Sequence, residues 1–208
     1  MDQTRKENGS QDVEYIGVGN FVLEIVKIVL LAFFVIVPIR VFLFQPFFVQ
    51  GASMEPNFED GEYLIINEFG YKDTSIGIGD SHLLTINHFK TVDRDRVVVF
   101  RYPLDPSKYF IKRVIGLPGE KVEIRNGHVT IFNKEHPDGF VLDESGYLPK
   151  GVNTSGDLVV TLKDNEYFVL GDNRPYSSDS RIWGTVPENL VIGEVLLRAW
   201  PLDRLNFY

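Results

Sequence analysis

Apolar residues follow two different patterns along the chain, and the first is one long run near the N-terminus. Residues 21–44 read FVLEIVKIVLLAFFVIVPIRVFLF, with charge only at Glu24, Lys27 and Arg40. A helix over this run would extend about 36 Å at about 1.5 Å per residue, enough to cross a bilayer core of about 30 Å. The charged side chains lie near the two ends, where they can reach the membrane interfaces. The run therefore predicts a transmembrane anchor, with residues 1–20 as a tail.

Two other interpretations of this run fit less well. A buried helix of a soluble protein has the right length, but the run is more apolar than such a helix needs to be. A cleavable signal peptide ends in small residues, whereas this run leads into Phe-Gln-Pro-Phe-Phe. The segment is therefore expected to remain attached as an anchor.

The orientation of the anchor follows from the positive charges that flank it. Arg5, Lys6 and Lys27 stand on the N-terminal side, against Arg40 on the other. Because positive charges favour the cytoplasmic side, the N-terminus is predicted to be cytoplasmic. Residues 45–208 would then be extracytoplasmic, and the protein a single-pass protein of the cell membrane.

Beyond the anchor, the apolar residues occur in short runs that end in turn residues, as in β-strands. The pair Asn-Gly at 126–127 is typical of a tight hairpin. Residues 70–95 are polar and interrupted and are predicted as a loop, and residues 125–165 as a peripheral insertion. We therefore expect a mostly β fold, an antiparallel β-sheet domain with one N-terminal transmembrane helix. The strand-like runs are 61–67, 96–103, 108–119, 121–133, 166–173 and 193–201.

Composition and charge narrow the possible functions. The formal net charge is −8 and the isoelectric point is near 5.0, so a nucleic-acid partner is not expected, because phosphate binding needs a basic face. The chain has no cysteine, which excludes disulfides, thiolate nucleophiles and cysteine-ligated metals. This absence suits an oxidising compartment outside the cytoplasm.

The stretch QGASMEPNFEDGEYLIIN, residues 50–67, contains a single serine, Ser53, shortly after the apolar run. A serine becomes a nucleophile only when a neighbouring base removes its proton. The four histidines fall in loop or hairpin contexts without a motif that would orient them, so a Ser-His-Asp triad is disfavoured. They are His82, His88, His128 and His136.

A lysine can be the base if burial keeps it neutral, since a solvated lysine has a pKa of about 10.4. Such a lysine should interrupt an apolar strand, as Lys112 does in YFIKRVIGL. Strand alternation alone does not choose between Lys112 and Arg113, but arginine cannot give up its proton. A lysine in a strand is more often an edge or surface residue, so this pattern alone leaves both interpretations open.

A third stretch, VLGDNRPYSSDSRIWG at residues 169–184, opens as an apolar strand and ends in a dense polar run. One interpretation is a solvated turn held by hydrogen bonds from aspartate to backbone. The other is a hydrogen-bonded scaffold behind a site, with a hydroxyl that orients the lysine and an Asp–Arg pair that braces the loop.

Four blocks together resemble the bacterial type I signal peptidases, also called leader peptidases: SMEP at 53–56, VVVFRYP at 97–103, FIKRVIGLPGE at 110–120 and GDNRPYSSDSR at 171–181. They occur in the order and spacing of that family. The resemblance implies a membrane-bound serine endopeptidase that needs no metal or other cofactor and cuts secretory preproteins after Ala-x-Ala-like sites. The expected partners are preproteins and the lipid bilayer, with the secretion translocase as a further candidate.

Carried over block by block, the resemblance implies Ser53 as nucleophile and Lys112 as general base. It implies shallow apolar pockets for small side chains, for which the analogous residues are Phe47, Val49, Phe58, Phe110 and Ile111. The supporting residues it implies are Ser177, Asp179, Arg181, Arg113 and Met54.

The chain departs from the family pattern at three places. Asn57 stands where members usually have threonine, and Asp95-Arg96 where many have Gly-Asp. Gly51 stands where some members have a serine that donates to the oxyanion. The oxyanion hole is therefore expected to use backbone N–H groups, including that of Ser53.

Two other functions remain as alternatives. A soluble Ser/Lys peptidase of the self-cleaving repressor type would share the β architecture, but neither the apolar run nor the acidic charge favours it. A non-enzymatic, membrane-anchored assembly factor for surface proteins would keep its function after Ser53→Ala.

Overall fold

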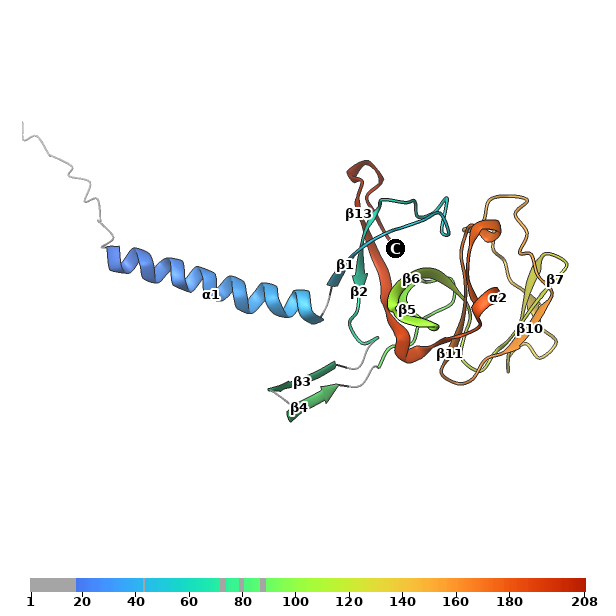
Figure 1. Ribbon diagram of the computed structural model, residues 1–208, viewed down its shortest axis with the longest axis horizontal. Helices are drawn as coiled ribbons and strands as arrows, with labels where there is room; N and C mark the ends of the chain where they lie inside the picture. The colour runs from blue at the N-terminus through green and yellow to red at the C-terminus, as the bar shows by residue number, and fades with distance from the viewer. Residues whose placement is uncertain (1–17, 43, 72–73, 79–80, 87–88) are drawn as a thin grey trace, which may run out of the picture. The chain divides into compact units, whose positions relative to one another are not determined.

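The computed structural model describes residues 18–42, 44–71, 74–78, 81–86 and 89–208 (Figure 1). The chain divides into two compact units, one ending at Arg40 and one spanning Val41–Tyr208. The described residues of the first unit form a helix, and the second unit is built mainly of β-sheets.

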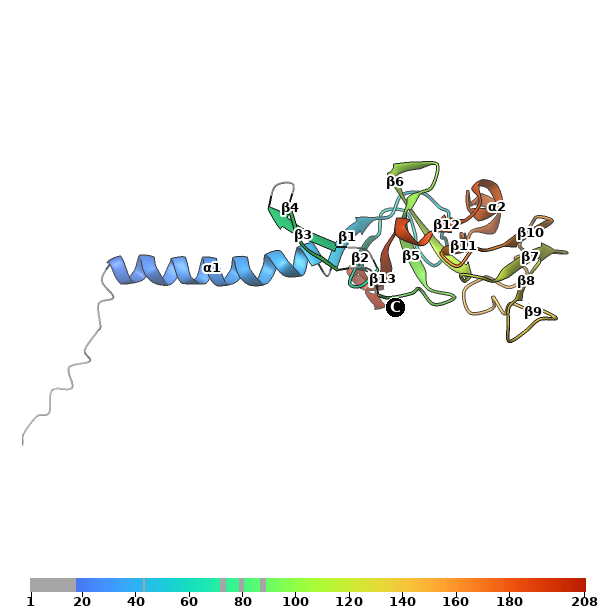
Figure 2. The same ribbon diagram turned by 90° about the horizontal axis from the view of Figure 1, so that it is seen from below.

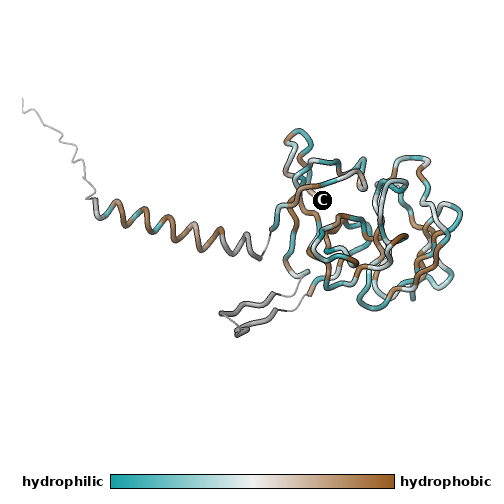
Figure 3. The backbone as a smooth tube through the Cα atoms, viewed as in Figure 1, coloured by the Kyte–Doolittle hydropathy of each residue, from teal (hydrophilic) through white to brown (hydrophobic). Residues whose placement is uncertain are grey.

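The helix α1 spans Val18–Phe42. Its most apolar segment, Gly19–Ile36, has a mean hydropathy of 2.3, and Figure 3 shows the hydrophobic colour continuing along it. The apolar side chains of this segment are exposed, and Lys27 forms an ion pair with Glu24 at 2.8 Å. The predicted N-terminal apolar helix is present, and it is long and apolar enough to cross a membrane.

The β unit is built around an eight-stranded sheet whose described strand pairs are all antiparallel. The strand order is β1-β2-β13-β5-β6-β11-β12, with β14 paired to β13. Successive residues of the central β5 enter two different apolar clusters, so both faces of the sheet are buried. The bounds are β1 Phe44–Phe48, β2 Tyr63–Asn67, β5 Val97–Tyr102, β6 Asp105–Gly116, β11 Glu166–Leu170, β12 Val186–Pro187, β13 Val191–Trp200 and β14 Asn206–Phe207.

A second sheet of four strands, in the order β10-β7-β8-β9, lies at one end of the β unit (Figure 2). Asn126 and Gly127 have φ values of 54° and 84°, which is the backbone of the tight hairpin predicted there. A Cβ at Gly116 would lie 2.5 Å from Val122, so glycine permits close packing of β6 against this sheet. The region 125–165 supplies three of these strands, β8 His128–Phe132, β9 Phe140–Val141 and β10 Leu158–Thr161, and the fourth is β7 Lys121–Arg125.

The prediction that residues 70–95 form a loop is wrong for residues 74–78 and 81–86, whereas the described residues 89–95 contain no helix or strand. Thr74–Ile78 (β3) and Ser81–Ile86 (β4) pair as antiparallel strands. Among the described strands they pair only with each other. The alternation of Thr74, Ile76 and Ile78 was the available signal, because β-branched residues at period two favour a strand.

The helices of the β unit are short. They are α2 Ser180–Trp183 and three 3₁₀ turns, η1 Arg174–Tyr176, η2 Glu188–Leu190 and η3 Leu202–Arg204.

Candidate active site

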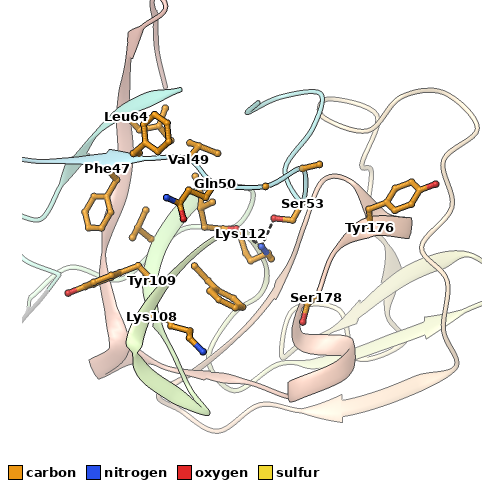
Figure 4. A pocket seen from close by; sticks show the side chains of 16 residues that line it. Phe47, Val49, Gln50, Ser53, Leu64, Lys108, Tyr109, Lys112, Tyr176 and Ser178 are labelled. Atoms are coloured by element: carbon orange, nitrogen blue, oxygen red, sulfur yellow. Dashed lines mark hydrogen bonds between the residues drawn. The ribbon is translucent and has the colours of Figure 1, made fainter. Parts of the chain in front are cut away.

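Ser53 and Lys112 come together although 59 positions separate them in the sequence. Ser53 lies in the turns that follow β1, and Lys112 lies in β6. The Lys112 Nζ atom is 2.8 Å from the Ser53 Oγ atom and donates a second hydrogen bond, at 2.7 Å, to the backbone oxygen of Ile111 (Figure 4). Serine and lysine are therefore within proton-transfer distance.

The surroundings of Lys112 favour a neutral amine. Lys112 is only 4% exposed, and its Nζ lies 5.5 Å from the centre of the Phe110 ring. Burial lowers the pKa of Lys112 from 10.5 to about 8, although the negative charges of Asp179 and Asp172 act in the opposite direction. At pH 7 about a tenth of the lysine is then neutral, several hundred times more than for a solvated lysine.

The polar stretch after β11 holds the serine turn in place. The backbone N–H of Asn173 donates to the backbone oxygen of Ser53 at 3.1 Å. The side-chain amide of Asn173 donates to the backbone oxygen of Ala52 at 2.9 Å. A Cβ at Gly171 would lie 2.4 Å from the backbone oxygen of Ser53 and 2.1 Å from the Oγ of Ser177. Only glycine therefore allows this stretch to approach the serine so closely.

Asp179 and Arg181 brace the same stretch from behind. Asp179 is fully buried and accepts hydrogen bonds from the Gly171 N–H at 3.1 Å and from Arg181 Nε at 2.8 Å. Arg181 also donates to the Arg174 backbone oxygen at 2.7 Å. Because these groups are buried and paired, residues 169–184 form a scaffold rather than a solvated turn.

Ser177 lies beside the pair, but the structure gives it no hydrogen bond to Lys112. Its Oγ is buried and has no partner among the described residues, and it packs against Gly171. Its role in orienting the amine stays a prediction.

A second buried network was not found from the sequence. Arg113 donates to Asp172 from Nε at 2.8 Å and from Nη2 at 2.5 Å. Asn57 donates to the same carboxylate at 2.8 Å and to the Tyr147 oxygen at 2.7 Å. Asn57, which stands where members of the family usually have threonine, thus links the turn that contains Ser53 to the strand β6 that contains Lys112, through the Asp172 carboxylate. The only sequence signal was an aspartate that follows a glycine at a strand end.

Arg174 forms another network that the sequence did not reveal. It is 1% exposed and donates to Glu144 at 2.6 Å, to the Gly171 oxygen at 3.0 Å and to Thr154. It therefore ties the scaffold to the segment between β9 and β10.

A cavity of about 740 Å³ opens over Ser53 and Lys112. Of the predicted pocket residues, Phe58 does not line it: this side chain is fully buried, with its ring 4.9 Å from that of Tyr208. Met54 is also fully buried, and Gly51 lines the cavity with φ 85°. Phe47, Val49, Phe110 and Ile111 do line it, together with Phe48, Gln50, Ala52, Leu64, Val99, Lys108, Tyr109, Tyr176 and Ser178.

No histidine lines this cavity in the described ranges, where His128 and His136 are exposed. The side chains of His82 and His88 lie outside what the structure describes. No three His, Asp or Glu side chains converge on a metal position within the described part of the chain.

Comparison with known proteins identifies the family. A family model described as "Signal peptidase, peptidase S26" matches residues 22–200. The chain is 32% identical over 190 residues to a "Probable signal peptidase I-2" of Synechocystis, covering 88% of this chain and 76% of that protein. It is 28% identical over 196 residues to "Signal peptidase IB" of Staphylococcus aureus, covering 89% and 93%. A crystal structure of a signal peptidase I from Enterococcus faecalis is 33% identical, with a TM-score of 0.42, and covers 51% of this chain and 97% of that one. The chain therefore belongs to the signal peptidase family, peptidase S26.

Proposed function

We propose that this peptidase removes signal peptides from secreted preproteins, with Ser53 as nucleophile and Lys112 as general base. The observation that carries the proposal is the 2.8 Å contact between the serine hydroxyl and a buried lysine whose pKa is lowered to about 8. When charged, the amine donates in this contact; when neutral, its lone pair can accept the serine proton.

The reaction proceeds in two halves. Lys112 takes the Ser53 proton as Oγ attacks the carbonyl of the scissile bond, and then gives that proton to the leaving amine of the mature protein. The signal peptide remains as an ester on Ser53. Lys112 next takes a proton from a water that attacks the ester, and returning this proton to Oγ releases the peptide and restores the serine.

The oxyanion of each tetrahedral intermediate needs hydrogen-bond donors at the serine turn. Gly51 has no side chain to donate, and its backbone N–H is already bonded to Asp60 at 2.6 Å. The Ser53 N–H has no acceptor among the described residues. We therefore assign the Ser53 N–H as one donor of the oxyanion hole.

The cavity supports a substrate with small apolar side chains before the scissile bond. Phe47, Val49 and Ile111 line its apolar side next to the Ser53–Lys112 pair. An apolar lining of this kind suits the small apolar side chains at the Ala-x-Ala ends of signal peptides. Ser177, buried beside the pair, would orient the lysine amine.

Cleavage of a preprotein tests the proposal directly. The full chain in detergent is given a preprotein with an Ala-x-Ala site, and wild type is compared with Ser53→Ala and Lys112→Ala. Both changes should lower the rate by about 10⁴-fold or more, as for other paired nucleophile and base residues. Lys163→Ala is the matched control, because Lys163 is an exposed lysine paired with Glu166.

The alternatives predict other outcomes. Cleavage by Lys112→Ala at the wild-type rate would contradict the mechanism. A wild type that cuts no preprotein, with a function in surface assembly that survives Ser53→Ala, would instead support the assembly-factor interpretation.

A further inference from the structure

One side of the cavity is not explained by the binding of the signal peptide. The apolar side chains Phe47, Val49 and Leu64 lie on one side of the Ser53–Lys112 pair, and Tyr176 and Ser178 lie on the other (Figure 4). A peptide bound across Ser53 has its acyl half on one side of the hydroxyl and its leaving half on the other. If the small residues of the signal peptide occupy the apolar side, the mature chain passes over Tyr176.

Tyr176 is unusual among the aromatic residues around the cavity because the residue is 78% exposed. It is nevertheless held in a fixed place. It ends the 3₁₀ turn η1, its N–H donates to the Asn173 oxygen at 3.0 Å, and the same turn contains the buried Arg174. Asn173 in turn holds the backbone of Ser53. The ring is thus presented to solvent on a support that is tied directly to the nucleophile.

The backbone after Tyr176 is extended and unpaired. Ser177 has φ −110° and ψ 125°, and Asp179 has φ −146° and ψ −165°. Ser177 is buried while Tyr176 and Ser178 are exposed, which is the alternation of a strand. No described residue accepts from the Ser177 or Ser178 N–H. An extended segment with free backbone groups can pair with an extended peptide.

We infer that residues 176–178 form the subsite for the first residues of the mature protein, where the Tyr176 ring contacts an apolar side chain. The inference rests on the proposed function, since it needs a peptide bound across Ser53. A tyrosine ring offers a large contact area and loses little conformational entropy on binding, so it can select among side chains without closing the site. Tyr176 is therefore a specificity-determining residue for the leaving half of the substrate.

Peptides that share one sequence before the cleavage site and differ after it test this inference. They keep the same Ala-x-Ala end and carry Leu, Phe, Gly, Asp or Lys at each of the first three positions after the cut. With the full chain in detergent, kcat/KM should favour Leu or Phe over Gly and Asp at one of these positions. Tyr176→Ala should reduce that preference about tenfold, and Tyr176→Phe should keep it, because the ring and not the hydroxyl makes the contact.

Controls separate this subsite from general effects. Ile182→Ala shortens a residue that is similarly exposed, at 73%, but does not line the cavity, and it should leave the preference unchanged. The preference for small residues on the signal side should stay the same in both Tyr176 variants.

Two outcomes would overturn the inference alone, and two others would overturn the proposed function with it. Tyr176→Ala could cleave all peptides in the wild-type ratios, or the wild type could prefer Lys to Leu, which would indicate a cation over the ring. If cleavage still required Ser53 in these two cases, the proposed function would remain supported. A wild type that cuts none of the peptides, or a Ser53→Ala variant that cuts them, would overturn the proposed function as well.

Discussion

The Lys112 amine is buried beside the Phe110 ring, where its charged form loses most of its hydration. Asp172 and Asp179 favour the charged form, but both carboxylates are already paired with arginines, at 2.5 Å and 2.8 Å. Their attraction for the ammonium is therefore partly offset, and desolvation is the larger effect. The same residue thus affects both activity and stability through its protonation state.

The first prediction concerns the pH dependence of cleavage. The base must be neutral, and the pKa of Lys112 is about 8, so kcat/KM should rise about tenfold per pH unit below pH 8 and level off above it. Rates for one peptide substrate between about pH 6 and 10 measure this. A plateau that begins near the ordinary histidine pKa of about 6.5 would contradict a lysine base.

The second prediction is that Lys112→Met inactivates the protein and stabilises it. The folded pKa of about 8 lies below the unfolded value of 10.5, so the unfolded chain binds more protons between these values and wild-type stability rises with pH there. Below pH 8 the buried lysine costs up to about 3 kcal/mol, less the hydrogen bonds to Ser53 and Ile111 that methionine removes.

Chemical denaturation at pH 7 and at pH 10 tests this second prediction. The gain in unfolding free energy from Lys112→Met should be larger at pH 7 than at pH 10, because at pH 7 folding of the wild-type chain buries a lysine that is still mostly charged. Lys163→Met, at an exposed position, should change little at either pH. Equal effects of Lys112→Met at the two pH values would contradict the proposed origin of the pKa shift.

At the scale of elements, the scaffold between β11 and α2 depends on a buried ion pair to another part of the chain. The Arg174 side chain is fully buried, and its carboxylate partner Glu144 comes from the segment between β9 and β10. Such a pair adds little to stability by itself, but loss of one partner leaves a charge buried without compensation. The region 125–165 is therefore connected to the active site, although no residue of it lines the cavity.

The third prediction is that Glu144→Ala destabilises the fold by about 3–5 kcal/mol. Because Arg174 shares its turn with Tyr176 and its neighbour Asn173 holds Ser53, cleavage should fall as well. Glu123→Ala is the control: Glu123 lies in β7 and pairs at 3.4 Å with the exposed Arg125, and should cost less than about 1 kcal/mol. Equal stability of the two variants in denaturant would show that Arg174 does not need its partner.

The strands that could be predicted are those with apolar alternation of their own. Runs such as 97–102 and 166–170 carry enough branched and aromatic residues to be recognised singly. The hairpin β3–β4 has a weaker signal: Thr74, Ile76 and Ile78 alternate, but the surrounding region is polar and interrupted, and among the described strands the hairpin pairs only with itself. Strand order was also not predictable, because it depends on contacts between residues far apart in the sequence.

The residues of the candidate site also differ in whether the local sequence predicts them. A lone serine after the anchor and a lysine in an apolar strand have local signals, and the four sequence blocks connect them. The partners of Asp172 have no local signal, because Arg113 and Asn57 lie 59 and 115 positions away from it in the sequence. Nothing in the local sequence shows which buried carboxylate a given arginine will meet.

At the scale of the whole molecule, the chain combines an apolar helix with a β unit that carries the candidate site. The helix α1 has the length and composition of a membrane span, and the family members cleave signal peptides according to their names. The proposed activity is useful only on the side of the membrane where preproteins emerge. The orientation of α1 is therefore part of the function, and the flanking charges are its only determinant visible in the sequence.

The fourth prediction is that residues 45–208 face the outside and the N-terminus faces the cytoplasm. Because the chain has no cysteine, single cysteines can report this: Ser145→Cys, at an exposed position, should react in intact cells with a membrane-impermeant maleimide, and Ser10→Cys only after lysis. Labelling of Ser10→Cys in intact cells would contradict the orientation.

The positive-inside rule also requires that the double variant Arg5→Glu with Lys6→Glu raise the fraction of molecules that insert with inverted orientation. Labelling of Ser145→Cys should then fall, and preprotein cleavage in cells should fall with it. Unchanged labelling in this double variant would mean that the folded β unit, and not the flanking charge, sets the orientation.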